Sequence, residues 1–296
     1  MTAAVDDILA LGVDAGATRC RARLRGRLGE IVAEAEGPAA NAYVDFHAAV
    51  RVARDCVARA LAATGGPSNY TSRVKLGLGV AGISSEADAR AFAAAFQGFN
   101  HVRVVNDVIA ACAGAHAGAD GGLVIAGTGT AGVARVGGRE TIVGGRGFLL
   151  GDDGSGARIG ADAVRAALRA YDGLSPDTGL TREIRRRFGD DPLAMTRWAI
   201  GAKPGDYGAF APLTLEAATE GDAIAVAIVE GAARALAALV GAVEARGAAR
   251  VSMIGGLSGP IQIFLAPALR ARLQPPKFDP VDGAILLAGG TVEAGA

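Results

Sequence analysis

The first part of the chain shows a clear alternation of apolar and polar positions on either side of a short polar turn. An apolar run at residues 8–13 ends at Asp14, and beyond the turn small apolar residues alternate with arginines over residues 19–25. A period of two is typical of a β-strand with one buried face. We therefore predict a β-hairpin over residues 8–24.

The turn of this hairpin, residues 15–18, carries a glycine and a hydroxyl group beside the carboxylate of Asp14. Gly16 permits a backbone conformation in which successive amide N–H groups point into one concavity, and such a concavity holds phosphate oxygens. The carboxylate of Asp14 could hold Mg²⁺ there, usually through water. An ordinary hairpin turn is the alternative interpretation of this segment taken alone.

The same pattern recurs in the middle of the chain. Residues 123–126 are apolar and run into a Gly-Thr-Gly-Thr turn at 127–130, after which apolar residues return over 133–136. Two such turns in matched positions are stronger evidence than either one alone. We predict that the two turns bind a polyphosphate from both sides.

Helices and strands alternate in the rest of the first half, whereas the second half is mostly helical. Apolar periodicity and turn residues predict helices at 43–63, 86–96, 108–119, 161–171, 181–188, 192–200, 207–218, 222–246, 260–273 and 283–288, and strands at 74–80, 101–105 and 251–254. The glycine- and alanine-rich faces of helices 108–119 and 283–288 predict that these two pack together. Residues 144–160 hold seven glycines and two adjacent aspartates, which indicates that backbone approaches a ligand there.

Composition narrows the class of protein. A chain of 296 residues forms one large domain or, more often, two domains with a cleft between them, and 51% hydrophobic residues are enough for large cores. The 30 acidic and 30 basic residues give zero net charge, which argues against nucleic acid or an anionic membrane as a partner. The three cysteines form no metal-ligand pattern and no disulfide framework. We expect a cytoplasmic protein, because the N-terminus has no basic n-region and the most apolar stretch, 223–243, is interrupted by Glu230 and Arg234.

Several motifs occur in an order that resembles the sugar kinase, Hsp70 and actin superfamily of ATP-binding proteins. They are residues 14–19, Gly37-Pro38 before Asn41, Asn106-Asp107, the turn at 127–130 and Gly255-Gly256-Leu257. Within that superfamily, residues 144–156 resemble the GGWG…GDEGSG stretch of the N-acetylglucosamine and glucosamine kinases, which share the broader BadF/BadG/BcrA/BcrD ATPase family.

The resemblance runs from about residue 9 to residue 287 and carries expectations about the fold. It implies an α/β protein with two ribonuclease-H-like (actin-like ATPase) domains and an interdomain cleft. We expect the first domain at residues 1–117 together with a closing helix at 282–296. The second domain is expected at residues 118–281.

The family also implies roles for individual residues. Asp14 would lie near Mg²⁺ and Asp107 would be the catalytic base. The residues implied in ATP binding are Gly16, Thr18, Arg19, Thr128, Gly129, Thr130, Ala218, Gly255 and Gly256. The residues implied in sugar binding are Asn41, Asp107, Gly145 and Asp152.

The chain departs from the family pattern at several positions. Ala15 and Ala17 stand where the first turn usually has glycines, Thr130 replaces a serine, and Asp153 replaces a glutamate. Arg146 stands where the related kinases have tryptophan, and this change bears on the preference for one sugar over another.

The candidate residues also have simpler structural interpretations. Asp107 would cap the helix that follows it, and Asn41 would cap the helix predicted from residue 43. Asp152 and Asp153 are common turn residues. The arginines of the returning strand most simply form a solvated face, on which Arg19 is the one able to reach phosphate. The two matched turns favour catalysis by Asp107 over a capping role alone.

We therefore expect an enzyme that uses ATP and Mg²⁺ to phosphorylate an amino sugar, N-acetyl-D-glucosamine at its 6-hydroxyl. Glucosamine is an alternative substrate. A BadF/BadG-type ATPase acting on a partner protein is a second alternative, disfavoured because Cys20, Cys56 and Cys112 have no paired spacing for an iron–sulfur cluster. A sugar-binding regulator without turnover is a third, and we expect no DNA-binding segment before Leu9. The expected partner is a small sugar, without nucleic acid or membrane, and a homodimer is compatible with the family.

Overall fold

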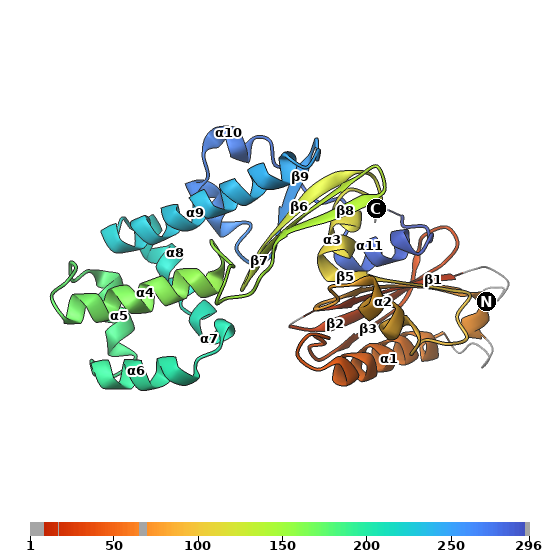
Figure 1. The fold of residues 1–296 in the computed structure, drawn as a ribbon, viewed down its shortest axis with the longest axis horizontal. Coiled ribbons are helices and arrows are strands. Elements are labelled where there is room, and N and C mark those ends of the chain that lie inside the picture. The colour runs from red at the N-terminus through yellow and green to blue at the C-terminus, as the bar shows by residue number, and fades with distance from the viewer. Residues whose placement is uncertain (1–8, 17, 65–69, 294–296) are drawn as a thin grey trace. The chain divides into compact units, whose positions relative to one another are not determined.

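The computed structural model describes residues 9–16, 18–64 and 70–293 and divides into two compact units (Figure 1). Unit 1 comprises residues 1–121, 135–140 and 275–296, and unit 2 comprises residues 122–134 and 141–274. Compared with the domain boundaries expected from the sequence, unit 1 additionally takes residues 118–121, 135–140 and 275–281. Two residues of the predicted hairpin, Ile8 and Ala17, lie outside the described residues.

Unit 1 is built on a five-stranded sheet with the strand order β3-β2-β1-β4-β5. The strands are β1 (Leu9–Ala15), β2 (Cys20–Arg25), β3 (Ile31–Gly37), β4 (Val74–Val80) and β5 (His101–Asn106). Strand β2 runs antiparallel to both β1 and β3, whereas β4 runs parallel to β1 and β5 runs parallel to β4. The predicted hairpin is therefore confirmed as β1 and β2.

Helices cover both faces of this sheet (Figure 1). They are α1 (Phe46–Ala62), α2 (Glu86–Ala93), α3 (Asp107–Ala115) and α11 (Pro280–Leu287), with a short 3₁₀ helix η1 (Tyr70–Arg73) before β4. Because side chains alternate along a strand, Leu11 and Leu76 lie in the core that α1 covers, while Gly12 and Gly77 face α11. Removing these apolar side chains from water is the main stabilising contribution to the unit.

Glycines let α11 approach the sheet and α3 closely. A Cβ atom added at Gly12 or Gly77 would overlap the backbone of α11, and one added at Gly283 would overlap the carbonyl oxygen of Ala110 in α3. A Cβ atom at Gly114 would overlap the carbonyl oxygen of Asp279, just before α11. The predicted packing of the two glycine- and alanine-rich helices is confirmed.

The second sheet has the strand order β8-β7-β6-β9 and lies mostly in unit 2. Its strands are β6 (Gly121–Ala126), β7 (Thr130–Val136), β8 (Arg139–Gly144) and β9 (Val251–Ile254), and β9 is parallel to β6. The other elements are α4 (Gly156–Tyr171), α5 (Gly179–Arg186), α6 (Pro192–Gly201), α7 (Pro204–Gly208), α8 (Ala211–Thr219), α9 (Ala223–Glu244), η2 (Pro260–Phe264) and α10 (Pro267–Arg270). The order repeats that of β3-β2-β1-β4, so the strand–turn–strand pattern that occurs twice in the sequence corresponds to two related sheets.

Several predicted boundaries differ from the structure. The helix predicted over 207–218 is two helices, α7 and α8, and the one predicted over 260–273 divides into η2 and α10 because Leu265 is extended and Pro267 begins a new turn. Strands β3 and β8 were not predicted. In β3 the alternation is confined to residues 33–37, with alanine as its apolar residue, and β8 has no buried residue. Helix α9 is long and apolar enough to cross a membrane by length and composition, which corrects the expectation from Glu230 and Arg234. Core helices pass the same test, and α9 buries residues such as Val229 and Leu236 within unit 2.

The close contact between α3 and α11 makes Gly283→Ala a sensitive test of this fold. The added methyl group meets the Ala110 carbonyl oxygen, so we expect the free energy of unfolding to fall by about 1–3 kcal/mol. Gly241→Ala in α9 is the matched control, because a Cβ atom there meets nothing within 4 Å. That control should gain up to about 1 kcal/mol from helix propensity. Urea unfolding of both variants measures the difference, and equal effects would contradict the packing.

Candidate functional site

The carboxyl ends of three parallel strands meet at one edge of the first sheet. Ala15 at the end of β1 is in register with Val80 of β4, and Val80 is in register with Asn106 of β5. The residues at or just beyond these strand ends therefore share one edge, where open α/β sheets commonly bind ligands. Asp14 and Asp107 are the two carboxylates at this edge.

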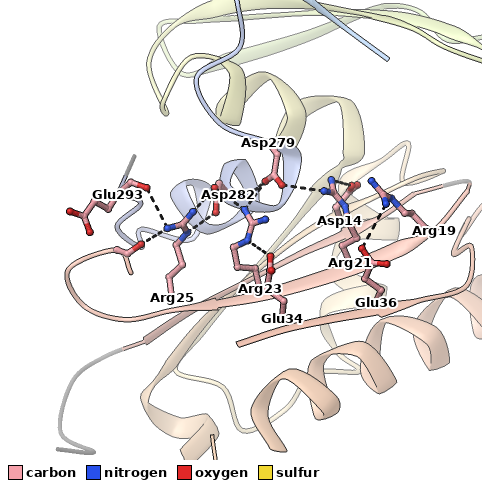
Figure 2. Close-up of polar contacts among 11 residues, drawn as sticks. Asp14, Arg19, Arg21, Arg23, Arg25, Glu34, Glu36, Asp279, Asp282 and Glu293 are labelled. Atoms are coloured by element: carbon pink, nitrogen blue, oxygen red, sulfur yellow. Dashed lines mark hydrogen bonds and ion pairs between the residues drawn. The ribbon is translucent and has the colours of Figure 1, made fainter. Parts of the chain in front are cut away.

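The two oxygen atoms of the Asp14 carboxylate have different environments. Its Oδ2 atom accepts a hydrogen bond of 2.9 Å from Nη2 of Arg21, which stands opposite it on β2 (Figure 2). Its Oδ1 atom faces the turn, 3.8 Å from the position a Cβ atom would take at Gly16. Burial raises the pKa of Asp14, and the hydrogen bond from Arg21 acts in the opposite direction.

The first turn is held by backbone contacts and presents exposed side chains. The amide of Gly16 donates to the carbonyl oxygen of Arg19 at 3.0 Å, and the amide of Ala40 donates to the carbonyl oxygen of Gly16 at 2.9 Å. Thr18 is exposed. Arg19 is exposed as well and lies 3.7 Å from the carboxylate of Glu36 in a surface ion pair.

Asn41 lies at the same sheet edge but does not cap a helix. It forms a parallel bridge with Ala81, and its Oδ1 atom accepts from the amide of Tyr43 at 2.9 Å. Helix α1 begins later than predicted, at Phe46, and Asp45 is its cap. The capping role predicted for Asn41 is therefore wrong.

Asp107 is the first residue of α3, and Asn106 takes the capping role instead. The Oδ1 atom of Asn106 accepts from the amide of Val108, while its Nδ2 atom donates to the carbonyl oxygen of Ile83 at 2.7 Å. The carboxylate of Asp107 also accepts from the Val108 amide and makes no ion pair with any described residue. Burial, with a smaller contribution from the negative charge of Asp14, raises the pKa of Asp107 to about 6.

The arginines of β2 do not form a solvated face, which corrects the expectation from the sequence. Figure 2 shows Arg21, Arg23 and Arg25 directed at two aspartates, Asp279 and Asp282, at the start of α11. We call these five residues together with Asp14 the arginine–aspartate network. Its ion pairs are Arg21–Asp14 (2.9 Å), Arg21–Asp279 (3.1 Å), Arg23–Asp279 (3.1 Å), Arg23–Asp282 (2.9 Å) and Arg25–Asp282 (2.7 Å).

Burial distinguishes the members of this network. Arg25 and Asp282 are 5% and 3% exposed, and the guanidinium binds both carboxylate oxygens at 2.7 Å. Arg23 is also paired with Glu34 of β3 at 2.7 Å. The sequence contains one sign of the network, two aspartates three residues apart around a helix-initiating proline, but nothing that assigns them to the arginines of β2.

In unit 2 the second turn is held by the helix that follows the glycine-rich segment. The amides of Gly156 and Ala157 at the start of α4 donate to the carbonyl oxygens of Gly127 and Thr128. Thr128 itself is exposed, so its side chain is accessible to a ligand. The hydroxyl of Thr130 is buried and donates to the carbonyl oxygen of Asp153 at 3.1 Å.

Asp152 lies against the second turn. Its Oδ1 atom accepts from the amide of Thr130 at 3.3 Å, and its Oδ2 atom would lie 2.9 Å from a Cβ atom at Gly129. Its backbone has a φ of 58°, which is uncommon for a residue with a side chain. Burial raises the pKa of Asp152, and the hydrogen bond from Thr130 opposes this. Left-handed residues of this kind cluster at ligand-binding sites, which favours a ligand contact for Asp152.

The glycine-rich segment is fixed at both ends and exposed in between. Gly145, with a φ of 65°, donates its amide to the carbonyl oxygen of Thr130, and Arg158 of α4 donates to the carbonyl oxygen of Gly151 at 3.2 Å. Arg146 is exposed and makes no hydrogen bond or ion pair within the part of the chain that the structure describes.

The remaining nucleotide-binding candidates differ in accessibility. Gly255 and Gly256 follow β9 and are exposed. Gly255 has a φ of 108° and lies against the backbone of Ala126, so a side chain does not fit there. Ala218 is 5% exposed and belongs to the apolar core of unit 2.

The residues present fit a weakly held Mg²⁺. No group of three or more His, Cys, Asp or Glu side chains able to hold a metal occurs among the described residues. Mg²⁺ commonly uses only one or two carboxylates and takes its other ligands from water and substrate phosphates. The Oδ1 atom of Asp14, facing the first turn, is the carboxylate oxygen suited to this.

Comparisons with known proteins give the family and the fold of the chain. Residues 11–288 match the model of the BadF/BadG/BcrA/BcrD ATPase family. Glucosamine kinase GspK of Vibrio cholerae is 34% identical over 281 residues, which cover 94% of this chain and 95% of the relative. A solved structure from Chromobacterium violaceum, described as a candidate N-acetylglucosamine kinase, is 32% identical with a TM-score of 0.86 and covers 95% of this chain and 98% of its own. A ROK family glucokinase from Streptomyces griseus shares the fold at 19% identity with a TM-score of 0.53, covering 95% of this chain and 99% of its own.

The raised pKa of Asp107 can be measured directly. Carboxyl carbon NMR of the aspartate-labelled protein should show Asp107 titrating near pH 6. Asp14→Asn removes a neighbouring negative charge that disfavours ionisation, so the midpoint should move down. Asp45→Asn, at the exposed start of α1, should leave it unchanged. An Asp107 midpoint near the ordinary aspartate value of about 4 in the wild type would contradict the buried environment.

Proposed function

We propose that this chain, which belongs to the BadF/BadG/BcrA/BcrD ATPase family, transfers the γ-phosphoryl group of ATP to the 6-hydroxyl of N-acetyl-D-glucosamine. The chain is an amino-sugar kinase with the actin-like ATPase fold. What we propose beyond this class is which sugar is phosphorylated, which of its hydroxyls accepts the phosphoryl group and what individual residues do.

The observation that carries the proposal is the environment of Asp107. Its carboxylate stands at the strand-end edge of the first sheet, is not neutralised by any described cation, and has a pKa of about 6. A general base works best when its pKa lies close to the working pH. Asp107 therefore accepts the proton of the sugar hydroxyl as that oxygen attacks the γ-phosphorus.

The two turns bind the phosphates of ATP. In the first turn, the hydroxyl of Thr18 reaches phosphate oxygens, and Arg19 adds positive charge once it leaves its surface pair with Glu36. Gly16, whose amide already donates to the carbonyl oxygen of Arg19, shapes this turn and leaves room for the phosphates. In the second turn, Thr128 and Gly129 play the same part. Because the hydroxyl of Thr130 already donates to Asp153 and its amide to Asp152, Thr130 acts by holding the glycine-rich segment against the second turn.

In this proposal Asp14 is the residue that would hold Mg²⁺, through water. A bound Mg²⁺ neutralises charge on the transferring phosphoryl group. The exposed backbone at Gly255 and Gly256 lies against the adenosine. Ala218 is the weakest of the expected nucleotide contacts, because its side chain is buried in the core.

Asn41, Gly145 and Asp152 bind the sugar together with Asp107. The exposed guanidinium of Arg146 lies in the same segment as Gly145 and Asp152. A guanidinium donates hydrogen bonds to an acetamido carbonyl and repels an ammonium, which favours the N-acetylated sugar. Glucosamine is a second candidate substrate, because the Vibrio cholerae relative is a glucosamine kinase. The carboxylates of Asp107 and Asp152 would also attract the ammonium group of glucosamine.

An ATPase that drives electron transfer in a partner protein receives less support than a sugar kinase. An iron–sulfur cluster needs accessible paired cysteines, whereas Cys20, Cys56 and Cys112 are all buried. We propose a cytoplasmic enzyme acting on a small sugar, and we treat α9 as a core helix because one face of it is buried in unit 2. The proposal also includes a homodimer.

Replacing Asp107 tests the catalytic assignment. Asp107→Asn keeps the size of the side chain but cannot accept a proton, so kcat should fall by about 100- to 10,000-fold. Because the base must be ionised, wild-type kcat/KM should decline as the pH falls through about 6. Calorimetric titration with nucleotide and with sugar checks that the variant still binds both. Wild-type turnover in the variant would show that another group, or none, acts as the base.

Arg146 tests the choice of sugar. The wild type should have a higher kcat/KM for N-acetylglucosamine than for glucosamine, and Arg146→Trp should reduce that ratio because repulsion of the ammonium is lost. Arg146→Lys retains the positive charge and is the matched control, expected to keep most of the preference. Faster phosphorylation of glucosamine by the wild type would replace N-acetylglucosamine with glucosamine as the substrate.

A further inference from the structure

Arg21 connects two carboxylates that lie far apart in the sequence. Its Nη2 atom donates to Oδ2 of Asp14 at 2.9 Å, and its Nη1 atom donates to Oδ2 of Asp279 at 3.1 Å. Arg21 and Asp14 are 19% and 17% exposed in their side chains, so neither is freely mobile in water. The planar guanidinium therefore occupies a fixed place between β1 and the start of α11.

The position of Asp279 is itself determined by several contacts. Its Oδ1 atom caps α11 by accepting from the amide of Asp282 at 3.0 Å and also accepts from Nη1 of Arg23 at 3.1 Å. The backbone beside it is anchored on α3, where the amide of Phe278 donates to the carbonyl oxygen of Gly114 at 3.1 Å. Asp279 is thus a rigid support for Arg21.

Because Asp279 holds Arg21 in place, Arg21 determines which carboxylate oxygen of Asp14 is available to a ligand. Arg21 occupies Oδ2, and Oδ1 is left facing the first turn beside Gly16. Without Arg21, the carboxylate could rotate and present either oxygen, and a ligand would have to select the productive orientation. Residues that hold a metal ligand in one orientation typically contribute about 10- to 100-fold to metal affinity.

We propose that Arg21 is a positioning residue that, braced by Asp279, holds Asp14 in the orientation needed to bind Mg²⁺ with nucleotide. The inference rests on the proposed role of Asp14 as the metal-binding carboxylate. It extends that role to a residue of the C-terminal segment, Asp279, which pairs with Arg21 and Arg23.

Arg23 provides a matched control for this proposal. It lies two residues further along β2 on the same face, is similarly buried at 15% side-chain exposure, and also pairs with Asp279. Its other partners are Glu34 and Asp282, and it makes no contact with Asp14. A purely structural role for the network predicts similar effects of Arg21 and Arg23 substitutions, whereas positioning of Asp14 predicts an effect of Arg21 alone.

The experiment is calorimetric titration of ADP in the presence of Mg²⁺ and in the presence of EDTA. The dissociation constant in EDTA divided by the dissociation constant in Mg²⁺ gives the metal-dependent part of nucleotide binding, and its measurement needs no turnover. It is measured for the wild type, Asp14→Asn, Arg21→Met, Arg23→Met and Asp279→Asn, with urea unfolding of each variant as a measure of stability.

We expect the metal-dependent ratio to fall about 10- to 100-fold in Arg21→Met and to fall less in Asp279→Asn. It should stay closest to the wild-type value in Arg23→Met, because the α11 cap and the Phe278–Gly114 hydrogen bond still hold Asp279. If Arg21→Met does not fold, Arg21→Lys takes its place. A lysine keeps the charge beside Asp14 but cannot bridge to Asp279 in the same geometry, so a smaller fall is expected.

The outcomes separate this inference from the proposed function. A wild-type ratio near one, or an unchanged ratio in Asp14→Asn, would overturn the metal-binding role of Asp14 itself. A collapsed ratio in Asp14→Asn with an unchanged ratio in the Arg21 variant would overturn only the positioning role. Equal losses in Arg21→Met and Arg23→Met would likewise overturn it, because they would indicate a general loosening of α11.

Discussion

The close approach of α11 to the first sheet and to α3 is the constraint on which the rest of unit 1 depends. Gly12, Gly77 and Gly283 have no side chains at the points where backbones meet, and any larger residue would separate the layers. This approach brings Asp279 and Asp282 within ion-pairing distance of the arginines of β2. It also fixes α3, whose first residue is Asp107. One packing arrangement therefore places both the support of Asp14 and the proposed base.

The arginine–aspartate network has a cost that the packing must offset. Burying a charged pair removes both ions from water, and such pairs often contribute little net stability, while removing one partner costs about 3–5 kcal/mol. Arg25 and Asp282, almost fully buried, are the clearest case. A network of this kind is better understood as a device that fixes geometry than as a source of stability. The arginine–aspartate network ends at Asp14, where one carboxylate oxygen is left available to a ligand, and this agrees with that interpretation.

Local patterns in the sequence predicted the elements that carry the two turns proposed to bind phosphate. The hairpins at Asp14 and at residues 127–130 were recognisable because alternation and turn residues occur together within a few positions. The pairing of Arg21 with Asp279 spans 258 residues and has no local signature, so the sequence suggested a solvated face instead. Similarly, the capping role of Asn106 rather than Asp107 depends on the φ and ψ angles of the two residues, which their side-chain types do not determine.

Phosphoryl transfer from ATP to one hydroxyl of an amino sugar is the central claim, and identification of the product tests it most directly. The protein is incubated with ATP, Mg²⁺ and N-acetylglucosamine, and the sugar product is analysed by phosphorus–proton correlation NMR. We predict one new phosphate ester whose phosphorus is coupled to the two protons on C6. Release of inorganic phosphate without a sugar ester, or an ester at the anomeric carbon, would contradict the claim.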